Sequence, residues 1–179
     1  MNIGFDLDKI FINYPPFVPT KLIDRLYKHK SNGVLLYRIP SKPEQIIRIL
    51  SHHPFLRPPI VKNLEFIKKL SSNKKNKHFL ISSRFSFLKN RTNAIINKYL
   101  FDRIFDSMIF NFQNQQPHIF KAKTVKKLKI DRYVDDDLPL LRFLAIDNMN
   151  TKFYWLNQNH NKQLSYNLFA IKNISEMLG

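Results

Sequence analysis

The sequence contains no cysteine among its 179 residues. Disulfides, thiolate metal sites and a cysteine nucleophile are therefore excluded. Long apolar runs are also absent, because Lys, Arg or Asn interrupts each candidate before it reaches the length of a membrane-spanning helix. Residues 1–12 carry two acids within their apolar stretch, which a secretory signal does not. We expect a cytoplasmic protein with no targeting segment and no membrane partner.

Acidic residues and glycine are scarce. The chain has 13 Asp and Glu against 30 Lys and Arg, a formal net charge of +17, and only 3 Gly. This charge fits a polyanionic partner such as nucleic acid, or a phosphorylated substrate that the field attracts. It also fits a compositional bias towards Lys, Asn, Ile and Phe, which the even spread of Lys along the chain favours. In so basic a chain, the places where acids cluster are informative.

Short apolar runs alternate with amphipathic segments along the chain. The runs at residues 2–7, 78–82, 107–112, 132–134 and 152–156 predict strands, and residues 60–70, 87–100 and about 122–128 predict helices. Such alternation is typical of an α/β fold, in which helices cover both faces of a Rossmann-like parallel sheet. In these sheets ligands bind at the carboxyl ends of the strands.

Residues 14–57 do not follow this alternation. Prolines break the chain after the first strand, residues 22–26 sketch a short helix, and residues 33–39 fit a strand or an extended flap. Ser41 and Glu44 form a capping-box pattern that opens another helix. We therefore predict a small, mainly helical cap at residues 14–57, inserted into a core formed by residues 1–13 and 58–179.

Two acidic clusters follow two of the predicted strands. Asp6 and Asp8 end the first strand on one face, since strand side chains alternate, and Asp135, Asp136 and Asp137 end a later one. The first pair alone also fits an Asp-rich turn. The second cluster makes a shared cation the simpler account, because closely packed carboxylates repel one another and provide the hard oxygen ligands that Mg²⁺ prefers.

These residues resemble the four motifs of the haloacid dehalogenase superfamily. Asp6-Leu7-Asp8 is similar to its first motif, and residues 79–84, with Ser82 and Ser83, are similar to its second. A helix that carries Lys121 and leads into the strand before Asp135-Asp136 is similar to the third and fourth motifs. Each motif is weakly specific, but all four occur in the expected order.

The resemblance implies catalytic roles for five residues. Asp6 would attack phosphorus and form an aspartyl-phosphate. Asp8 would protonate the leaving oxygen and later activate water, so we expect its pKa to lie nearer neutrality. Ser82 and Ser83 would bind the phosphoryl oxygens. Lys121 would neutralise the developing charge and steady Asp6.

The resemblance also implies a Mg²⁺ site. Asp6, Asp135 and the backbone carbonyl of Asp8 would hold the ion, and Asp136 would join through water or orient the other ligands. Asp137 is the least defined member of the acidic run.

The sequence departs from the family pattern at one turn. Many members have Gly-Thr or Gly-Val after the second Asp, where this chain has Lys9-Ile10. The change removes backbone freedom and brings a charge close to the site. Lys123 is an alternative to Lys121 as the catalytic lysine; we favour Lys121 because we expect it to start the helix.

Several other residues invite a functional interpretation. The six histidines lack metal-binding spacing, and we interpret His52-His53 as a polar helix end. Arg84 fits either a substrate contact or a salt bridge, and Trp155 fits the core. Four cap arginines could recognise a phosphate or base, although each also fits an ordinary surface charge: Arg25, Arg38, Arg48 and Arg57.

The pattern predicts a Mg²⁺-dependent phosphomonoester hydrolase that works through an aspartyl-phosphate. A nucleotide is the preferred substrate, from a resemblance to deoxyribonucleotidase-like members, ahead of another small phosphorylated metabolite. Two alternatives stay open: a phosphatase that acts on nucleic-acid ends, and a non-catalytic, basic nucleic-acid-binding protein on the same scaffold. The sequence does not specify the oligomeric state.

Overall fold

A seven-stranded sheet forms the centre of the molecule. The computed structural model describes residues 1–16, 28–31, 34–73, 75–157 and 162–179. The strands pair in parallel except at one edge, where β8 runs antiparallel to β9. In spatial order the strands are β5 (Ser107–Phe110), β4 (Lys77–Ser82), β1 (Asn2–Phe5), β6 (Arg132–Asp135), β7 (Lys152–Leu156), β9 (Leu168–Ile171) and β8 (Lys162–Ser165).

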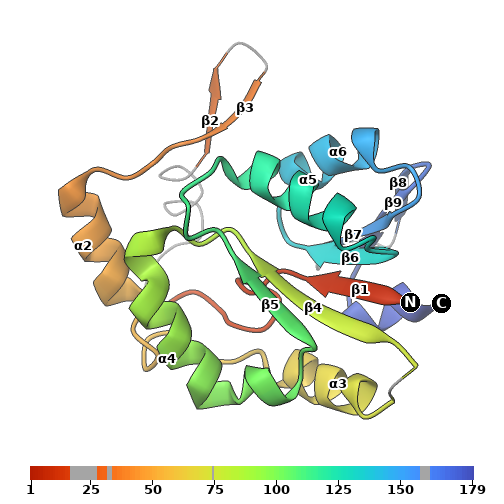
Figure 1. Cartoon of the computed structure of the whole chain (residues 1–179), viewed down its shortest axis with the longest axis horizontal. Helices are drawn as coiled ribbons and strands as arrows, with labels where there is room; N and C mark the ends of the chain where they lie inside the picture. Colours follow the sequence, from red (N-terminus) through yellow and green to blue (C-terminus); the bar gives the residue numbers. More distant parts are fainter. Residues whose placement is uncertain (17–27, 32–33, 74, 158–161) are drawn as a thin grey trace.

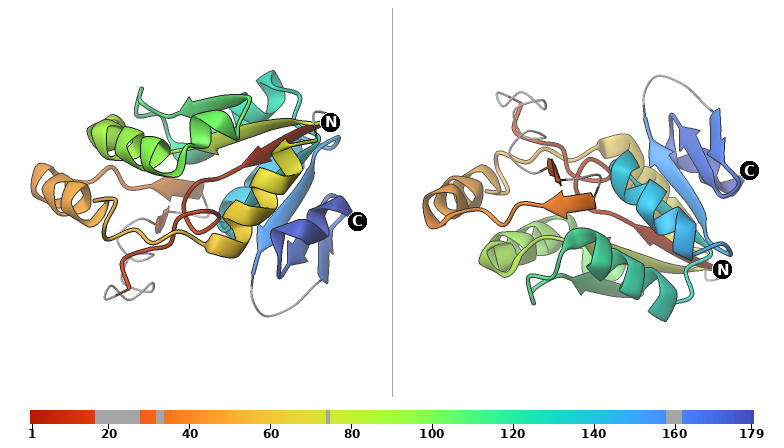
Figure 2. Two further views of the ribbon diagram at one scale, coloured as in Figure 1. Left: turned by 90° about the horizontal axis from the view of Figure 1, so that it is seen from below. Right: turned by 90° about the horizontal axis from the view of Figure 1, so that it is seen from above.

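Helices cover both faces of this sheet, as the two views of Figure 2 show. One face carries α3 (Val61–Ser71), α4 (Lys89–Tyr99) and the short helix η3 (Ile174–Leu178), and the other carries α5 (Pro117–Lys127) and α6 (Leu138–Asp147). Two short 3₁₀ helices, η1 (Ser86–Leu88) and η2 (Phe101–Arg103), flank α4. The predicted α/β fold class is confirmed.

The period-two alternation of each strand divides the core into two layers. Leu80, Val134 and Tyr154 pack against α3 and α4, whereas their neighbours Ile81, Tyr133 and Phe153 pack against α5 and α6. Both faces of the central strands are thus buried, which explains why these strands are almost wholly apolar.

Gly4 allows a close contact at the centre of the sheet. A Cβ at this position would lie 2.8 Å from Cδ2 of Tyr133 on the neighbouring strand. Tyr133 is fully buried, and its ring crosses β1 where only a glycine leaves room. One of the three glycines therefore positions a tyrosine that reaches the acidic residues described below.

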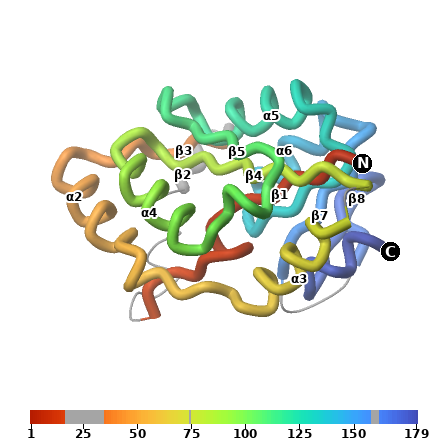
Figure 3. The backbone as a smooth tube through the Cα atoms, turned by 60° about the horizontal axis from the view of Figure 1, so that its bottom comes forward, coloured from red at the N-terminus to blue at the C-terminus, as the bar shows by residue number. Residues whose placement is uncertain are grey.

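The described part of the segment between β1 and α3 lies beyond the carboxyl ends of the strands (Figure 1). Its described part contains a hairpin, β2 (Lys28–Ser31) and β3 (Val34–Tyr37), followed by α2 (Lys42–Ser51). Ser41 and Glu44 form the predicted capping box of α2. The tube in Figure 3 shows α2 beside α4, while both chain termini lie at the far end of the sheet. The short helix predicted at residues 22–26 and Arg25 lie outside the described residues.

The five predicted strands and the three predicted core helices all occur. Helix α6 and strands β8 and β9 were not predicted; α6 is apolar on most of its surface, and β8, Lys-Gln-Leu-Ser, is mostly polar. No helix in the described part of the chain is long and apolar enough to cross a membrane.

Candidate functional site

The acids meet where the strand order reverses. The chain runs outward from β1 through β4 to β5, then returns to β6 on the other side of β1. Asp6 follows β1 and Asp135 ends β6, and the Asp6 amide donates to the carbonyl of Val134 at 3.0 Å. Both carboxylates are buried, with 5% and 1% of each residue exposed. This point between adjacent carboxyl ends is where open α/β sheets bind ligands.

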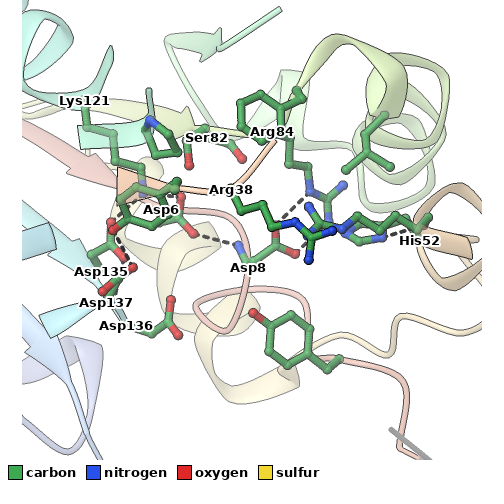
Figure 4. Close-up of a pocket in the computed structure, with 17 residues that line it drawn as sticks. Asp6, Asp8, Arg38, His52, Ser82, Arg84, Lys121, Asp135, Asp136 and Asp137 are labelled. Carbon is green, nitrogen blue, oxygen red and sulfur yellow. Dashed lines mark hydrogen bonds and ion pairs between the residues drawn. The ribbon is translucent and has the colours of Figure 1, made fainter. Parts of the chain in front are cut away.

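Lys121 bridges the two strand ends (Figure 4). Its Nζ donates to Asp6 Oδ1 at 2.8 Å and to Asp135 Oδ2 at 2.6 Å. We expected Lys121 to start its helix, and this was wrong. Helix α5 begins four residues earlier, and Lys121 reaches the acids from the second turn. Lys123 is exposed, so Lys121 is the lysine that the fold places at the site.

Three carboxylates gather at this point, with Lys121 between two of them and Lys9 beside the third. Oxygens of Asp6, Asp135 and Asp136 lie within 4.8 Å of one another. Burial raises the pKa of Asp6 to about 8, with Asp135 adding to the rise and Lys121 opposing it. Burial and Asp135 likewise raise the pKa of Asp136 to about 7. A divalent cation would favour the ionised form of all three groups, and this all-oxygen donor set fits Mg²⁺.

Asp8 has different partners from Asp6. Arg84 donates to its two carboxylate oxygens, from Nε at 2.8 Å and from an NH2 group at 2.7 Å, and Arg57 forms a second ion pair with it. Burial alone would raise the pKa of Asp8, but Arg84 and then Arg57 hold it well below its usual range. We expected a pKa nearer neutrality; the two guanidinium groups explain the difference.

The two arginines also correct earlier interpretations. Arg84 forms the salt bridge that we weighed against a substrate contact, and its NH1 donates to Thr92 at 3.3 Å. Arg57 is only 1% exposed, so it is not a surface charge. It lies where the insertion returns to the core, under the ring of Tyr14 at 4.9 Å. The charge on Asp8 is thus neutralised partly by the core and partly by the boundary of the insertion.

Lys9 takes the backbone conformation that the missing glycine would adopt easily. Its φ of 57° lies in the left-handed region, which is costly for a residue with a side chain. Its amide donates to the carbonyl of Ile12 at 2.8 Å and closes the turn after β1. Its Nζ lies 3.1 Å from Asp136, so the predicted charge at the site is present and pairs with an acid.

Asp137 makes contacts that stabilise the fold. It is the N-cap of α6, where its side chain accepts from the amide of Leu140, and it also accepts a 2.8 Å hydrogen bond from the hydroxyl of Tyr37. It is not part of the carboxylate trio that could hold a metal. Asp137 therefore connects the hairpin to the core.

A pocket joins these groups. Ser82, buried at the end of β4, and the half-buried Ser83 lie on its core side with the acids. On the insertion side it is lined by Tyr14, Tyr37, Arg38, Arg48 and His52. His52 ends α2 as predicted, but it is buried, and burial followed by Arg84 and Arg57 lowers its pKa well below the usual value.

Sequence reasoning missed the aromatic residues that support the site. The Tyr133 hydroxyl donates to Asp135 Oδ2 at 3.1 Å, and its ring lies 5.8 Å from Nζ of Lys121. Trp155, expected in the core, is half-buried and donates from Nε1 to the carbonyl of Asp136 at 3.0 Å. Trp155 pairs with Asp135 in the strand register, and Tyr133 lies two residues before Asp135 on the same strand, so the two side chains share a face. That alternation along β6 is the signal that could have located Tyr133.

Comparison with known proteins identifies the fold. No family model matches the sequence, and no curated protein matches it either. Among solved structures, a candidate β-phosphoglucomutase from Thermotoga maritima has a TM-score of 0.63 at 15% identity, over 99% of this chain and 96% of that chain. A HAD-superfamily hydrolase from Ehrlichia chaffeensis has a TM-score of 0.56 at 13% identity, over 98% of this chain and 93% of that chain.

A haloacid dehalogenase-like family hydrolase from Xanthomonas campestris also has a TM-score of 0.56, at 12% identity, over 96% of this chain and 90% of that chain. These likenesses span nearly the whole of each chain. The predicted resemblance to the haloacid dehalogenase superfamily is therefore confirmed at the level of the fold.

Proposed function

We propose that this chain is a Mg²⁺-dependent hydrolase that cleaves phosphomonoesters through an aspartyl-phosphate on Asp6. One observation carries the proposal: Asp6 lies at the reversal point of the sheet with Lys121, Asp135 and Asp136 around it. Core packing does not explain a buried lysine between two buried acids, because burying such charges costs free energy. Proteins that share the fold are named as hydrolases, which agrees with this chemistry.

The reaction has two displacements. A carboxylate oxygen of Asp6 attacks phosphorus as the bond from phosphorus to the leaving oxygen breaks, and the leaving alcohol takes up a proton. Water then attacks phosphorus, inorganic phosphate leaves, and the carboxylate is restored. Lys121 keeps Asp6 oriented throughout, and Ser82 and Ser83 hold the phosphoryl oxygens. Mg²⁺ bound by Asp6, Asp135 and Asp136 would neutralise charge on the transferring group.

Proton transfer at the leaving oxygen is assigned to Asp8. It is two residues from Asp6 and lines the same pocket. Its ion pairs with Arg57 and Arg84 leave it ionised, so it must exchange at least one guanidinium contact before it can carry a proton. We propose that a bound substrate brings about this exchange.

The proposed substrate is a nucleotide or another small phosphorylated metabolite. The pocket is bounded by the insertion on one side, which supports a compact ligand. Its aromatic lining, Tyr14, Tyr37 and Phe85, suits the flat face of a base or the carbon skeleton of a sugar.

The test is turnover of p-nitrophenyl phosphate and of a panel of nucleoside monophosphates. We expect hydrolysis with Mg²⁺, loss of hydrolysis with EDTA, and recovery when Mg²⁺ is restored. Asp6→Asn should lower kcat by roughly 10³-fold or more while the protein stays folded at the assay temperature. Asp147→Asn is the matched control, because Asp147 is an exposed acid at the end of α6.

Wild-type rates in Asp6→Asn would rule out the nucleophile. No turnover on any substrate, together with salt-sensitive binding of an oligonucleotide, would instead identify a non-catalytic nucleic-acid-binding protein.

A further inference from the structure

The wall of the pocket opposite the acids is cationic. Arg38, on the loop after β3, and Arg48, on α2, line the same pocket as Asp6. Arg48 is 7% exposed, so its side chain lies on the inner face of α2. Figure 4 shows Arg38 on the side of Asp8 where Arg84 and His52 lie, across from Asp135 and Asp136. A ligand that extends from Asp6 into this pocket therefore meets two further guanidinium groups.

This wall is fixed to the core by several contacts. The side-chain amide of Gln116 accepts from the amide of Tyr37 at 3.0 Å and donates to its carbonyl at 3.2 Å. Arg91 of α4 donates to the carbonyl of Ile49 in α2 at 3.1 Å. At the boundary, the amide of Asn13 donates to the carbonyl of Pro58 at 2.8 Å. The two arginines thus have a defined place relative to the acids, as recognition of a second group requires.

Three arginines line the pocket and a fourth, Arg57, lies beside it; they differ in what they contact. Arg57 and Arg84 are committed to Asp8. Arg38 pairs with Glu44 at 2.9 Å, and the two side chains are 41% and 27% exposed. Such an exposed pair contributes little free energy, so Arg38 can exchange Glu44 for a phosphate while Glu44 stays in the capping box of α2. Arg48 is buried in the pocket wall, where lower dielectric strengthens its attraction for an anion.

Less polar groups also line the pocket. They are Phe85, Leu88, Pro117 and Tyr14. These side chains suit a carbon skeleton that separates two anionic ends. A single phosphoryl group at Asp6 would leave the arginine wall unused.

We infer that Arg38 and Arg48 bind a second phosphate group of the substrate, on the side of the pocket away from Asp6. The inference rests on the proposed function, since it places the first phosphate at Asp6. Paired guanidinium groups suit phosphate because each presents two parallel donors to its oxygens. The second phosphate belongs either to a small bisphosphate or to the neighbouring linkage of a nucleic-acid end, and both offer the same chemistry.

The experiment compares substrates that differ by one phosphate. We would measure kcat/KM for p-nitrophenyl phosphate, a nucleoside monophosphate, the corresponding nucleoside 3′,5′-bisphosphate, and an oligonucleotide with a terminal phosphate. We expect the wild type to prefer the last two. In Arg38→Gln the ratio of bisphosphate to monophosphate kcat/KM should fall about tenfold, mainly through KM, as expected for loss of one charged hydrogen bond.

Two further variants separate recognition from general effects. Arg48→Lys keeps the charge but loses the paired donors, so it should lower the same ratio by a smaller factor than Arg48→Gln. Arg103→Gln removes an exposed arginine beyond α4 and should leave the ratio at the wild-type value. Thermal unfolding of each variant checks that the fold is intact.

Three outcomes decide the inference. A preference for the bisphosphate or the oligonucleotide that falls in Arg38→Gln supports it, and the better of the two substrates identifies the source of the second phosphate. Equal kcat/KM for mono- and bisphosphate in the wild type overturns it. If no phosphomonoester turns over, the proposed function fails, and calorimetric binding then decides: tighter binding of the bisphosphate that is lost in Arg38→Gln supports the second site, and equal binding overturns it.

Discussion

The two walls of the pocket are built in different ways. The core wall places Asp6 and Asp135 at the ends of buried strands, and Lys121, from the second turn of α5, makes short contacts with both. The insertion wall is a hairpin and one short helix, whose inner face carries Arg38 and Arg48. Its helix α2 leaves Ile46, Ile47 and Leu50 largely exposed, so little apolar burial holds it. Chemistry is therefore assigned to the apolar core, and recognition to a part that polar contacts hold against it.

This difference leads to an ordering of expected effects. Changes in the core wall disturb buried charges, for which burial leaves no solvent to compensate. Changes at the boundary between the core and the insertion act through Asp8, which forms ion pairs with Arg84 of the core and with Arg57 of the boundary. Changes in the insertion alter contacts that water can partly replace, so their effects on the free energy of unfolding should be smaller.

The largest effect on the free energy of unfolding should come from Lys121→Met. Removing the ammonium leaves Asp6 and Asp135 buried and facing each other without their bridge. Loss of one partner from such a network costs about 3–5 kcal/mol, and loss of a charge at the reacting group costs about 10²-fold or more in kcat. Urea unfolding with and without Mg²⁺ measures the loss of stability, and turnover of p-nitrophenyl phosphate measures the loss of kcat.

Lys123→Met is the matched control, two residues along the same helix and exposed. It should stay within about 0.5 kcal/mol of the wild type. Equal losses in the two variants would mean that Lys121 is not the residue that supports the acidic cluster. If metal binds there, added Mg²⁺ should restore part of the stability that Lys121→Met loses, because a cation replaces the missing charge.

The core wall is also the part that the sequence predicts best. Apolar runs ending in acids locate Asp6 and Asp135, because parallel strands bring their carboxyl ends to one edge. Arg57 and Tyr37 could not be placed in this way. Arg57 lies 49 residues from its partner Asp8, and Tyr37 lies 100 residues from its partner Asp137. The hairpin strand β2 has the sequence Lys-His-Lys-Ser, which carries no strand periodicity.

An intermediate effect is expected from Asp8→Asn, which changes the residue that contacts both the core and the boundary of the insertion. If Asp8 exchanges its arginine contacts and donates a proton, the variant should lose about 10²-fold more kcat on an alkyl phosphate than on p-nitrophenyl phosphate, whose leaving group needs no proton. Both substrates are measured on one preparation, so a change in the amount of folded protein cancels from the ratio.

An equal loss on both substrates would limit Asp8 to its ion pairs with Arg57 and Arg84. Asp106→Asn is the control for a general loss of acidic charge, since Asp106 is exposed on the far side of the sheet, before β5. It should leave the ratio between the two substrates unchanged.

The smallest effect should come from the insertion, in Tyr37→Phe. The variant removes the hydroxyl that donates to Asp137 at 2.8 Å but keeps the ring that stacks on His118. Asp137 is half-buried, so water can take over part of the contact, and we expect a loss of about 1 kcal/mol at neutral pH. Tyr166→Phe, at a tyrosine 78% exposed, should cost nothing measurable.

The pH dependence gives this variant a second readout. Burial, followed by Asp137, raises the pKa of Tyr37 above its ordinary value near 10. Above that pH the unfolded chain loses a proton that the folded chain keeps, so the wild type should lose stability as pH rises, by up to about 1.4 kcal/mol per pH unit for this one group. Urea unfolding at pH 8 and pH 10.5 should show a shallower decline in Tyr37→Phe, because its phenyl ring has no proton to lose. An identical decline in both proteins would mean that the hairpin does not hold Tyr37 against the core in solution.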